Sequence, residues 1–144
     1  MTGLRGRWEM LAERPLTICD TGHNSHGLQY VARQLKQLAN PHVWIVFGMV
    51  NDKDTDVVMR LLPVNDPSHT YHYIFTRPNT QRARSAQEML ELYNALPGRE
   101  GTAMGISDPI EAIRYAQEHA APEDAVFIGG SNYLVSDALP LFAH

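Results

Sequence analysis

The sequence has a single cysteine and no long apolar run, and each scarcity excludes a class of protein. Cys19 alone can form neither an intrachain disulfide framework nor a cysteine-based zinc cage. The longest apolar run, residues 43–50, is interrupted by Gly48. It is far shorter than the roughly 20 residues of a membrane span. The N-terminus has no apolar segment of the kind that a secretory signal needs. We therefore expect a reduced, cytoplasmic protein without a membrane partner.

Positive charge is also scarce. The chain has 12 Lys and Arg against 16 Asp and Glu, which gives a formal net charge of -4 at pH 7. No basic run interrupts this balance, so a nucleic-acid partner is not expected. The 144 residues are 44% hydrophobic and 19% charged. This composition excludes a disordered chain and predicts one domain, covering residues 1–144, with a sizeable core.

Two phosphate-binding motifs are missing. No Gly-x-Gly-x-x-Gly sequence follows the first predicted strand, and no Gly-x-x-x-x-Gly-Lys-Ser/Thr loop occurs anywhere in the chain. Their absence argues against a dinucleotide-binding fingerprint and against a P-loop ATPase that is complete within this chain.

Apolar runs with strand character alternate with stretches of helical period. The runs predict five strands, at residues 16–20, 43–48, 71–75, 102–104 and 125–128. Helix-start signals follow four of them, at Asn24 or Ser25, at Asp54, at Ser85 with Glu88, and at Asp108. In the helix after Asp54, the residues expected to face the core are Val57, Val58, Leu61 and Leu62. A final short helix is expected after the turn at residues 129–131.

This alternation predicts an α/β fold. We expect a single three-layer Rossmann-like domain, with a mostly parallel sheet of about five or six strands and helices on both faces. Ligands of such sheets bind at the carboxyl ends of the strands. Polar loops follow four of the predicted strands, at residues 20–24, 48–54, 76–84 and 129–132. These loops are where we expect the functional site.

The loop at residues 20–24 is the most informative segment. Asp20 ends a buried strand, where its carboxylate is suited to accept hydrogen bonds from a ribose or another hydroxyl-bearing ligand. His23 and Asn24 then lie at a helix N-terminus, which favours anions. Helix capping by Asp20 and Asn24, with a solvated His23, explains the same residues equally well. A metal site formed by Asp20, His23 and His26 is disfavoured, because no second carboxylate is close by.

The other loops carry weaker signals. Lys53 is one of only two lysines and lies between two aspartates, so it is a candidate for an anionic substrate, although a solvated loop is the favoured interpretation. The Gly-Gly-Ser turn that ends in Ser131 resembles an anion-binding turn, and tight turning explains it equally well. Arg7 is a candidate phosphate ligand, and an ordinary surface arginine explains it equally well, while the neighbouring Trp8 is expected to pack on the sheet.

A basic cluster follows the third predicted strand. It consists of Arg77, Arg82 and Arg84. Such a cluster can meet a polyanionic substrate, but a solvated loop is the favoured interpretation.

Four sequence blocks, taken in order, are similar to the C-terminal domain of the folylpolyglutamate synthase/dihydrofolate synthase branch of the Mur ligase family. The resemblance covers nearly the whole chain. The blocks are Gly6-Arg7-Trp8-Glu9, Asp20-x-x-His23-Asn24, Gly48 followed by Asp52-Lys53-Asp54, and Gly130-Ser131-x-Tyr133-Leu134-Val135. The last two favour the folate branch over the cell-wall branch.

The resemblance implies a ligase that joins L-glutamate to dihydropteroate or folate through an acyl phosphate made from ATP. It implies ATP contacts for Arg7, Asp20 and Asn24, with Arg7 and His23 catalytic. It places His23, Ser131 and Lys53 near the incoming glutamate. The family's P-loop and magnesium ligands belong to a preceding ATPase domain. We therefore expect ATP and Mg²⁺ to bind mainly to that partner domain, with no metal ligand in this chain.

The chain is then expected to be an excised or separately made lid domain, inactive alone. Two other interpretations remain open. A stand-alone regulatory module would use the same crevice to bind a nucleotide or a small acid tightly without catalysis. A structural domain would dock on a partner through an exposed apolar patch and would bring no polar groups together.

Overall fold

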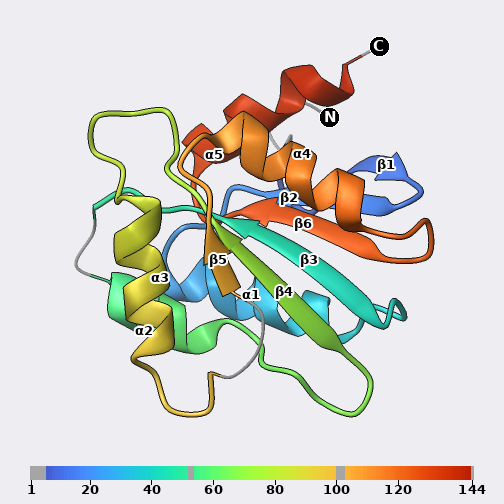
Figure 1. Cartoon of the computed structure of the whole chain (residues 1–144), viewed down its shortest axis with the longest axis horizontal. Coiled ribbons are helices and arrows are strands. Elements are labelled where there is room, and N and C mark those ends of the chain that lie inside the picture. Colours follow the sequence, from blue (N-terminus) through green and yellow to red (C-terminus); the bar gives the residue numbers. More distant parts are fainter. Residues whose placement is uncertain (1–5, 52–53, 100–102, 144) are drawn as a thin grey trace.

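A computed structural model describes residues 6–51, 54–99 and 103–143 (Figure 1). The chain folds into one six-stranded sheet with the strand order β1-β2-β6-β3-β4-β5. The strands are β1 (Glu9–Glu13), β2 (Leu16–Asp20), β3 (His42–Phe47), β4 (Thr70–Phe75), β5 (Ala103–Gly105) and β6 (Ala125–Gly129). The helices are α1 (Ser25–Lys36), α2 (Thr55–Leu61), α3 (Ala86–Asn94), α4 (Pro109–His119) and α5 (Asn132–Ala138), followed by a 3-10 turn at Leu139–Phe142. The predicted α/β fold with a mostly parallel sheet is confirmed.

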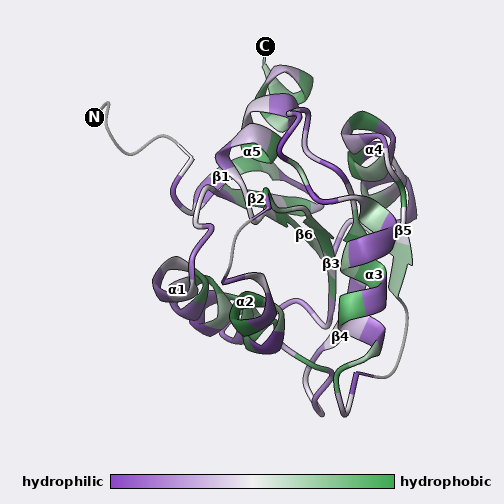
Figure 2. Ribbon diagram, turned by 90° about the vertical axis from the view of Figure 1, so that its left-hand side faces the viewer, coloured by the Kyte–Doolittle hydropathy of each residue, from purple (hydrophilic) through white to green (hydrophobic). Residues whose placement is uncertain are grey.

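The helices form two layers around the sheet. Helices α1, α2 and α3 pack on one face, over a core that includes Leu35, Val58, Met89 and Phe127. Helices α4 and α5 pack on the other face, over Val46, Ile128 and their neighbours. Figure 1 shows α4 and α5 on one side of the strands and α2 and α3 on the other. In Figure 2 the hydrophobic strands run between helices whose outer surfaces are hydrophilic.

The topology determines where a ligand crevice opens. The chain passes from β2 to β3, β4 and β5 through helices on one face, and then returns through α4 on the other face to place β6 between β2 and β3. Strands β2, β6, β3, β4 and β5 run parallel to one another. Because the direction of connection changes at β6, the carboxyl ends of β2, β6 and β3 frame the crevice at which such sheets bind ligands.

Most helix-start signals act as the sequence indicates. The Asn24 side chain accepts a hydrogen bond from the Gly27 amide at the start of α1. Ser85 and Glu88 form a capping box at the start of α3. Asp108 caps α4, whose first residue is proline. These local hydrogen bonds explain why the helix starts were predictable from the sequence.

Val58 and Leu62 are buried in the core and Leu61 packs against it, as predicted for α2, but Val57 is not. Val57 was expected in the core but is 45% exposed, whereas Met59 is 1% exposed. The buried side chains of this helix are Thr55, Val58 and Met59. The helix has only 7 residues, so packing against the sheet selects one of two neighbouring apolar stripes.

Strand β1 was not predicted. It pairs antiparallel with β2 at the edge of the sheet and is interrupted by an irregularity between Met10 and Ala12. Met10 is 57% exposed, so the segment lacks the apolar pattern of a buried strand.

None of the helices in the described part of the chain combines the length and the apolarity that a membrane crossing requires.

Candidate functional site at the carboxyl edge of the sheet

Three strand-end turns meet at the carboxyl edge. Gly129, the last residue of β6, is in register with Asp20 of β2 on one side and with Phe47 of β3 on the other. A Cβ atom on Gly130 would lie 2.6 Å from the Gly48 carbonyl oxygen, and the φ angle of Gly130 is +101°. Both the close approach and the left-handed backbone require glycine. The Gly-Gly-Ser turn therefore lets three loops contact one another at this edge.

The segment before β1 crosses the same edge. The Thr21 amide donates a 2.7 Å hydrogen bond to the Gly6 carbonyl. The Trp8 ring packs on Phe127 of the sheet with the ring centroids 5.8 Å apart, which confirms the predicted packing of Trp8. These contacts place Arg7, between Gly6 and Trp8, beside the end of β2.

Asp20 holds this segment in place. Its carboxylate accepts hydrogen bonds from the Trp8 amide at 2.9 Å and from the Gly22 amide at 2.7 Å. The Arg7 Nε atom lies 3.7 Å from Asp20 Oδ1, and the side-chain exposures are 51% for Arg7 and 0% for Asp20. Two amides and a guanidinium compensate the desolvation of the buried carboxylate. A nucleotide can reach the Asp20 carboxylate only if Arg7 and Trp8 move.

His23 and Asn24 lie on the solvent side of this turn. Both are exposed. The Asn24 side-chain oxygen accepts the capping bond from Gly27, so the capping explanation of this residue applies. The His23 Nδ1 atom is 3.4 Å from the Thr21 carbonyl oxygen. Within the described ranges no three His, Cys, Asp or Glu side chains gather in a way that could hold a metal ion.

Ser131 lies directly after the Gly-Gly turn at the crevice. It is 1% exposed, and its hydroxyl oxygen caps α5 by accepting a 3.0 Å hydrogen bond from the Tyr133 amide. The structure thus gives Ser131 a local capping role at the place where the predicted glutamate contact lies. Lys53, the remaining predicted substrate residue, lies outside the described residues.

The loops after β3 and β4 are joined, which the sequence did not indicate. The Asn51 amide donates to the Arg82 carbonyl at 2.7 Å, and the Arg84 amide donates to the Met49 carbonyl at 2.9 Å. This pairing brings Arg82 and Arg84 to a polar depression of about 390 Å³ that Asn51 also lines. Arg84 Nη1 lies 3.7 Å from Glu88. The sequence could not reveal this pairing, because the bonded backbone groups are about thirty residues apart and involve no side-chain pattern.

Arg77 lies apart from the other two arginines. It lines a pocket of about 530 Å³ with Ser107, Asp108 and Asp137 among its walls. Burial raises the pKa of Asp137, and the nearby Asp108 acts in the same direction, while a hydrogen bond from the Asn79 amide opposes them. The three arginines therefore belong to two surfaces and do not form one basic cluster.

Comparison with known proteins identifies the family to which this fold belongs. Residues 6–132 match the family model described as "Mur ligase, glutamate ligase domain". The chain is 27% identical to the dihydrofolate synthase/folylpolyglutamate synthase of Bacillus subtilis (strain 168) over 135 residues, which are 92% of this chain and 29% of that protein. It is 25% identical to the UDP-N-acetylmuramoyl-L-alanyl-D-glutamate--2,6-diaminopimelate ligase of Janthinobacterium sp. (strain Marseille), over 92% of this chain and 27% of that protein.

Solved structures give the same result. The bifunctional folylpolyglutamate synthase/dihydrofolate synthase from Yersinia pestis, complexed with AMPPNP and a Mn ion, superposes with a TM-score of 0.80 at 27% identity, covering 96% of this chain and 31% of that one. The chain thus spans less than a third of the length of these proteins. The match to the family model covers most of the sequence, so the chain belongs to the Mur ligase family, through its glutamate ligase domain.

Proposed function

We propose that this domain is the lid of an ATP-dependent ligase that adds L-glutamate to dihydropteroate or folate. A preceding P-loop domain would hold ATP and Mg²⁺, and the carboxyl edge of this domain would close over them. The observation that carries the proposal is the half-exposed Arg7 guanidinium, held by the buried Asp20 carboxylate beside the Gly-Gly-Ser turn. Two relatives add support: one structure of the folate enzyme is complexed with AMPPNP and Mn, and another has L-glutamate bound as well.

Arg7 is the residue suited to the phosphoryl-transfer step. In the reaction, the substrate carboxylate would attack the terminal phosphorus of ATP, so that ADP leaves and an acyl phosphate forms. The incoming amine would then attack the acyl carbon, lose a proton and release inorganic phosphate. Closure of the domain would bring the Arg7 guanidinium against the transferring phosphoryl group, where it stabilises the negative charge. Arginines delivered in this way raise rates by about 10³–10⁵ in other phosphoryl-transfer enzymes.

Asp20 then acts through Arg7 in this conformation. The backbone amides of Trp8 and Gly22 occupy its carboxylate oxygens, so it fixes the segment that carries Arg7. The contact between Asp20 and the nucleotide that the resemblance implies would form only after this segment moves. Asn24 would meet the nucleotide through its exposed amide group, because its oxygen caps α1.

His23 and Ser131 would lie on the side of the incoming glutamate. His23 presents an exposed ring beside the same turn, and Lys53 would add a positive charge for the amino-acid carboxylates. Such a site would accelerate the reaction mainly by positioning the amine beside the acyl phosphate, because the bimolecular encounter of the two reactants becomes an effectively unimolecular step. The preceding domain would supply the metal ligands.

A titration of the isolated chain separates this function from that of a regulatory module. With ATP and Mg²⁺ added, a lid domain binds at most weakly, with a dissociation constant in the millimolar range. The amide NMR signals that shift are then confined to the turns at residues 20–24 and 129–131. A stand-alone nucleotide-binding module shows micromolar binding, which Arg7→Ala abolishes. Micromolar binding by the isolated wild-type chain would therefore replace the lid by the regulatory function.

A further inference from the structure

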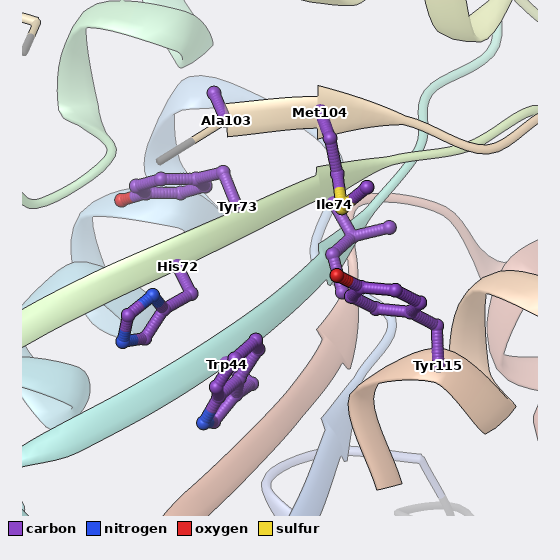
Figure 3. A pocket seen from close by; sticks show the side chains of 7 residues that line it. All are labelled: Trp44, His72, Tyr73, Ile74, Ala103, Met104 and Tyr115. Carbon is purple, nitrogen blue, oxygen red and sulfur yellow. The ribbon is translucent and has the colours of Figure 1, made fainter. Parts of the chain in front are cut away.

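The opposite end of the sheet carries a second group of chemically active side chains. Helices α4 and α5 leave the amino ends of β3 and β4 partly open on their face of the sheet, where His42, Trp44 and His72 lie side by side. A shallow pocket of about 200 Å³ adjoins them, and its walls include Trp44, His72, Met104 and Tyr115. Figure 3 shows the Trp44 and His72 rings next to each other, with Tyr115 and Met104 farther along the sheet.

Strand register brings two imidazoles together. Trp44 is paired with His72 across β3 and β4, so His42, two residues before Trp44, points to the same face as both. The His42 Nδ1 atom and the His72 Nε2 atom form a 3.0 Å hydrogen bond, so one of the two nitrogens carries the shared proton, which a bound metal ion would replace. The two rings are nearly parallel, with centroids 5.2 Å apart.

Neighbouring groups fix the orientation of the pair. The His72 ring stacks on Trp44 with centroids 4.1 Å apart and planes 17° apart. The Trp44 Nε1 atom donates a 3.2 Å hydrogen bond to Asp124, which is buried. His42 is exposed and His72 is half-buried, so the pair lies at the surface of the sheet edge.

The separation of the two nitrogens matches that of two ligands on one metal ion. Metal–imidazole bonds are about 2.0–2.1 Å long, so two ligands at a right angle have nitrogens about 2.9 Å apart. A right angle between ligands is the geometry that Cu²⁺ and Ni²⁺ adopt with nitrogen ligands.

We propose that His42 and His72 bind one divalent transition-metal ion of the Cu²⁺ and Ni²⁺ class, with water completing the coordination. The ion would tie β3 to β4 at the amino edge of the sheet. Because the described residues provide no third ligand, water would fill the remaining coordination positions. The ion would therefore exchange with solution more readily than an ion in a structural site. Its formation is independent of the proposed ligase function, since it uses none of the residues at the carboxyl edge.

The test is a titration with CuCl₂ monitored at the histidine ring signals of the NMR spectrum. Sub-stoichiometric Cu²⁺ should broaden the signals of His42 and His72 first, before those of the exposed His23 and His26. Calorimetric titration should give one tight site, which either His42→Gln or His72→Gln weakens by about tenfold or more, because each variant removes a ligand held beside the other. His26→Gln, at an exposed position on α1, is the matched control and should leave the affinity unchanged.

Two results would overturn the proposal. The first is uniform broadening of the histidine signals, which would mean that Cu²⁺ binds any accessible imidazole. The second is an affinity for Cu²⁺ that stays unchanged in the His42→Gln variant, because a proposed ligand would then be unnecessary for binding. The wild-type NMR experiment needs no variant, so the proposal stays falsifiable even if His72→Gln fails to fold.

Discussion

The Arg7 guanidinium lies 3.7 Å from the Asp20 carboxylate, although twelve residues and strand β1 separate the two. Asp20 is buried and its partner is half exposed, so the carboxylate fixes the base of a side chain whose charge still faces solvent. Two backbone amides share the same carboxylate. The pair therefore has separable roles, which substitutions can distinguish.

Replacing Asp20 should destabilise the fold. Asp20→Ala leaves the partly buried Trp8 and Gly22 amides without their acceptor, and an unsatisfied donor costs up to about 1–3 kcal/mol. We expect the free energy of unfolding, measured with urea, to fall by about 3 kcal/mol. Glu118→Ala, at an exposed position late in α4, is the control and should change it by less than about 0.5 kcal/mol. A loss for Asp20→Ala as small as that of the control would contradict the anchoring role.

Replacing Arg7, unlike replacing Asp20, should leave the stability of the fold almost unchanged. Because its side chain is 51% exposed, the ion pair is screened by solvent and contributes less than about 1 kcal/mol to stability. We expect Arg7→Ala to leave the urea midpoint almost unchanged. A loss of stability comparable to that of Asp20→Ala would show that Arg7 is a structural residue and would remove the main support for its catalytic role.

The Gly-Gly turn provides a matched pair of glycine variants. Gly130→Ala would place a Cβ atom 2.6 Å from the Gly48 carbonyl oxygen at a φ angle of +101°, whereas Gly98, with a φ angle of +73°, has no neighbouring atom within 4 Å of such a Cβ. Gly98→Ala should cost about 1 kcal/mol for the backbone conformation alone. Gly130→Ala should cost about 2 kcal/mol more, because three loops must separate. Thermal unfolding of both variants measures the difference, and equal losses would contradict the close contact of the turns.

The loop before β4 should contribute to stability in a pH-dependent way. Slight burial tends to raise the pKa of Asp66, but hydrogen bonds from the Ser68 and His69 amides and from the His69 ring outweigh it and hold the pKa below its usual 3.8. A carboxyl group whose pKa is lowered by folding stabilises the folded state above its unfolded pKa, and the effect disappears as the pH falls through the folded value. Asp66→Asn should therefore be less stable than the wild type near pH 6. The difference should shrink as the pH falls below about 3.8, and a difference that persists at pH 2 would contradict this origin.

The sequence predicts the elements of this fold well because their signals are local. Strand β2 has the predicted bounds at Leu16–Asp20, and the caps at Asn24, Ser85 and Asp108 bond to residues two or three positions away. Strand β1 was missed because it is a half-exposed edge strand, defined by its partner β2 more than by its own side chains.

The site is predictable only in part, for the same physical reason. Sequence resemblance picks out Arg7, Asp20 and Ser131, but the hydrogen bond from the Trp8 amide to the Asp20 carboxylate and the backbone pairing of Val50 with Ala83 are non-local contacts. No side-chain pattern encodes such contacts. They nevertheless decide that the Asp20 carboxylate is buried and that the loops after β3 and β4 form one surface.

The rate of glutamate-dependent ADP release tests the central claim most directly. It is measured on a protein in which the chain is joined to a P-loop ATPase domain of the family, and dihydropteroate is the acceptor. The lid function predicts that the joined protein releases ADP, that the isolated 144-residue chain does not, and that Arg7→Ala lowers kcat by on the order of 10³ without unfolding the domain. ATP turnover by the isolated chain, or an Arg7→Ala rate equal to that of the wild type, would contradict it.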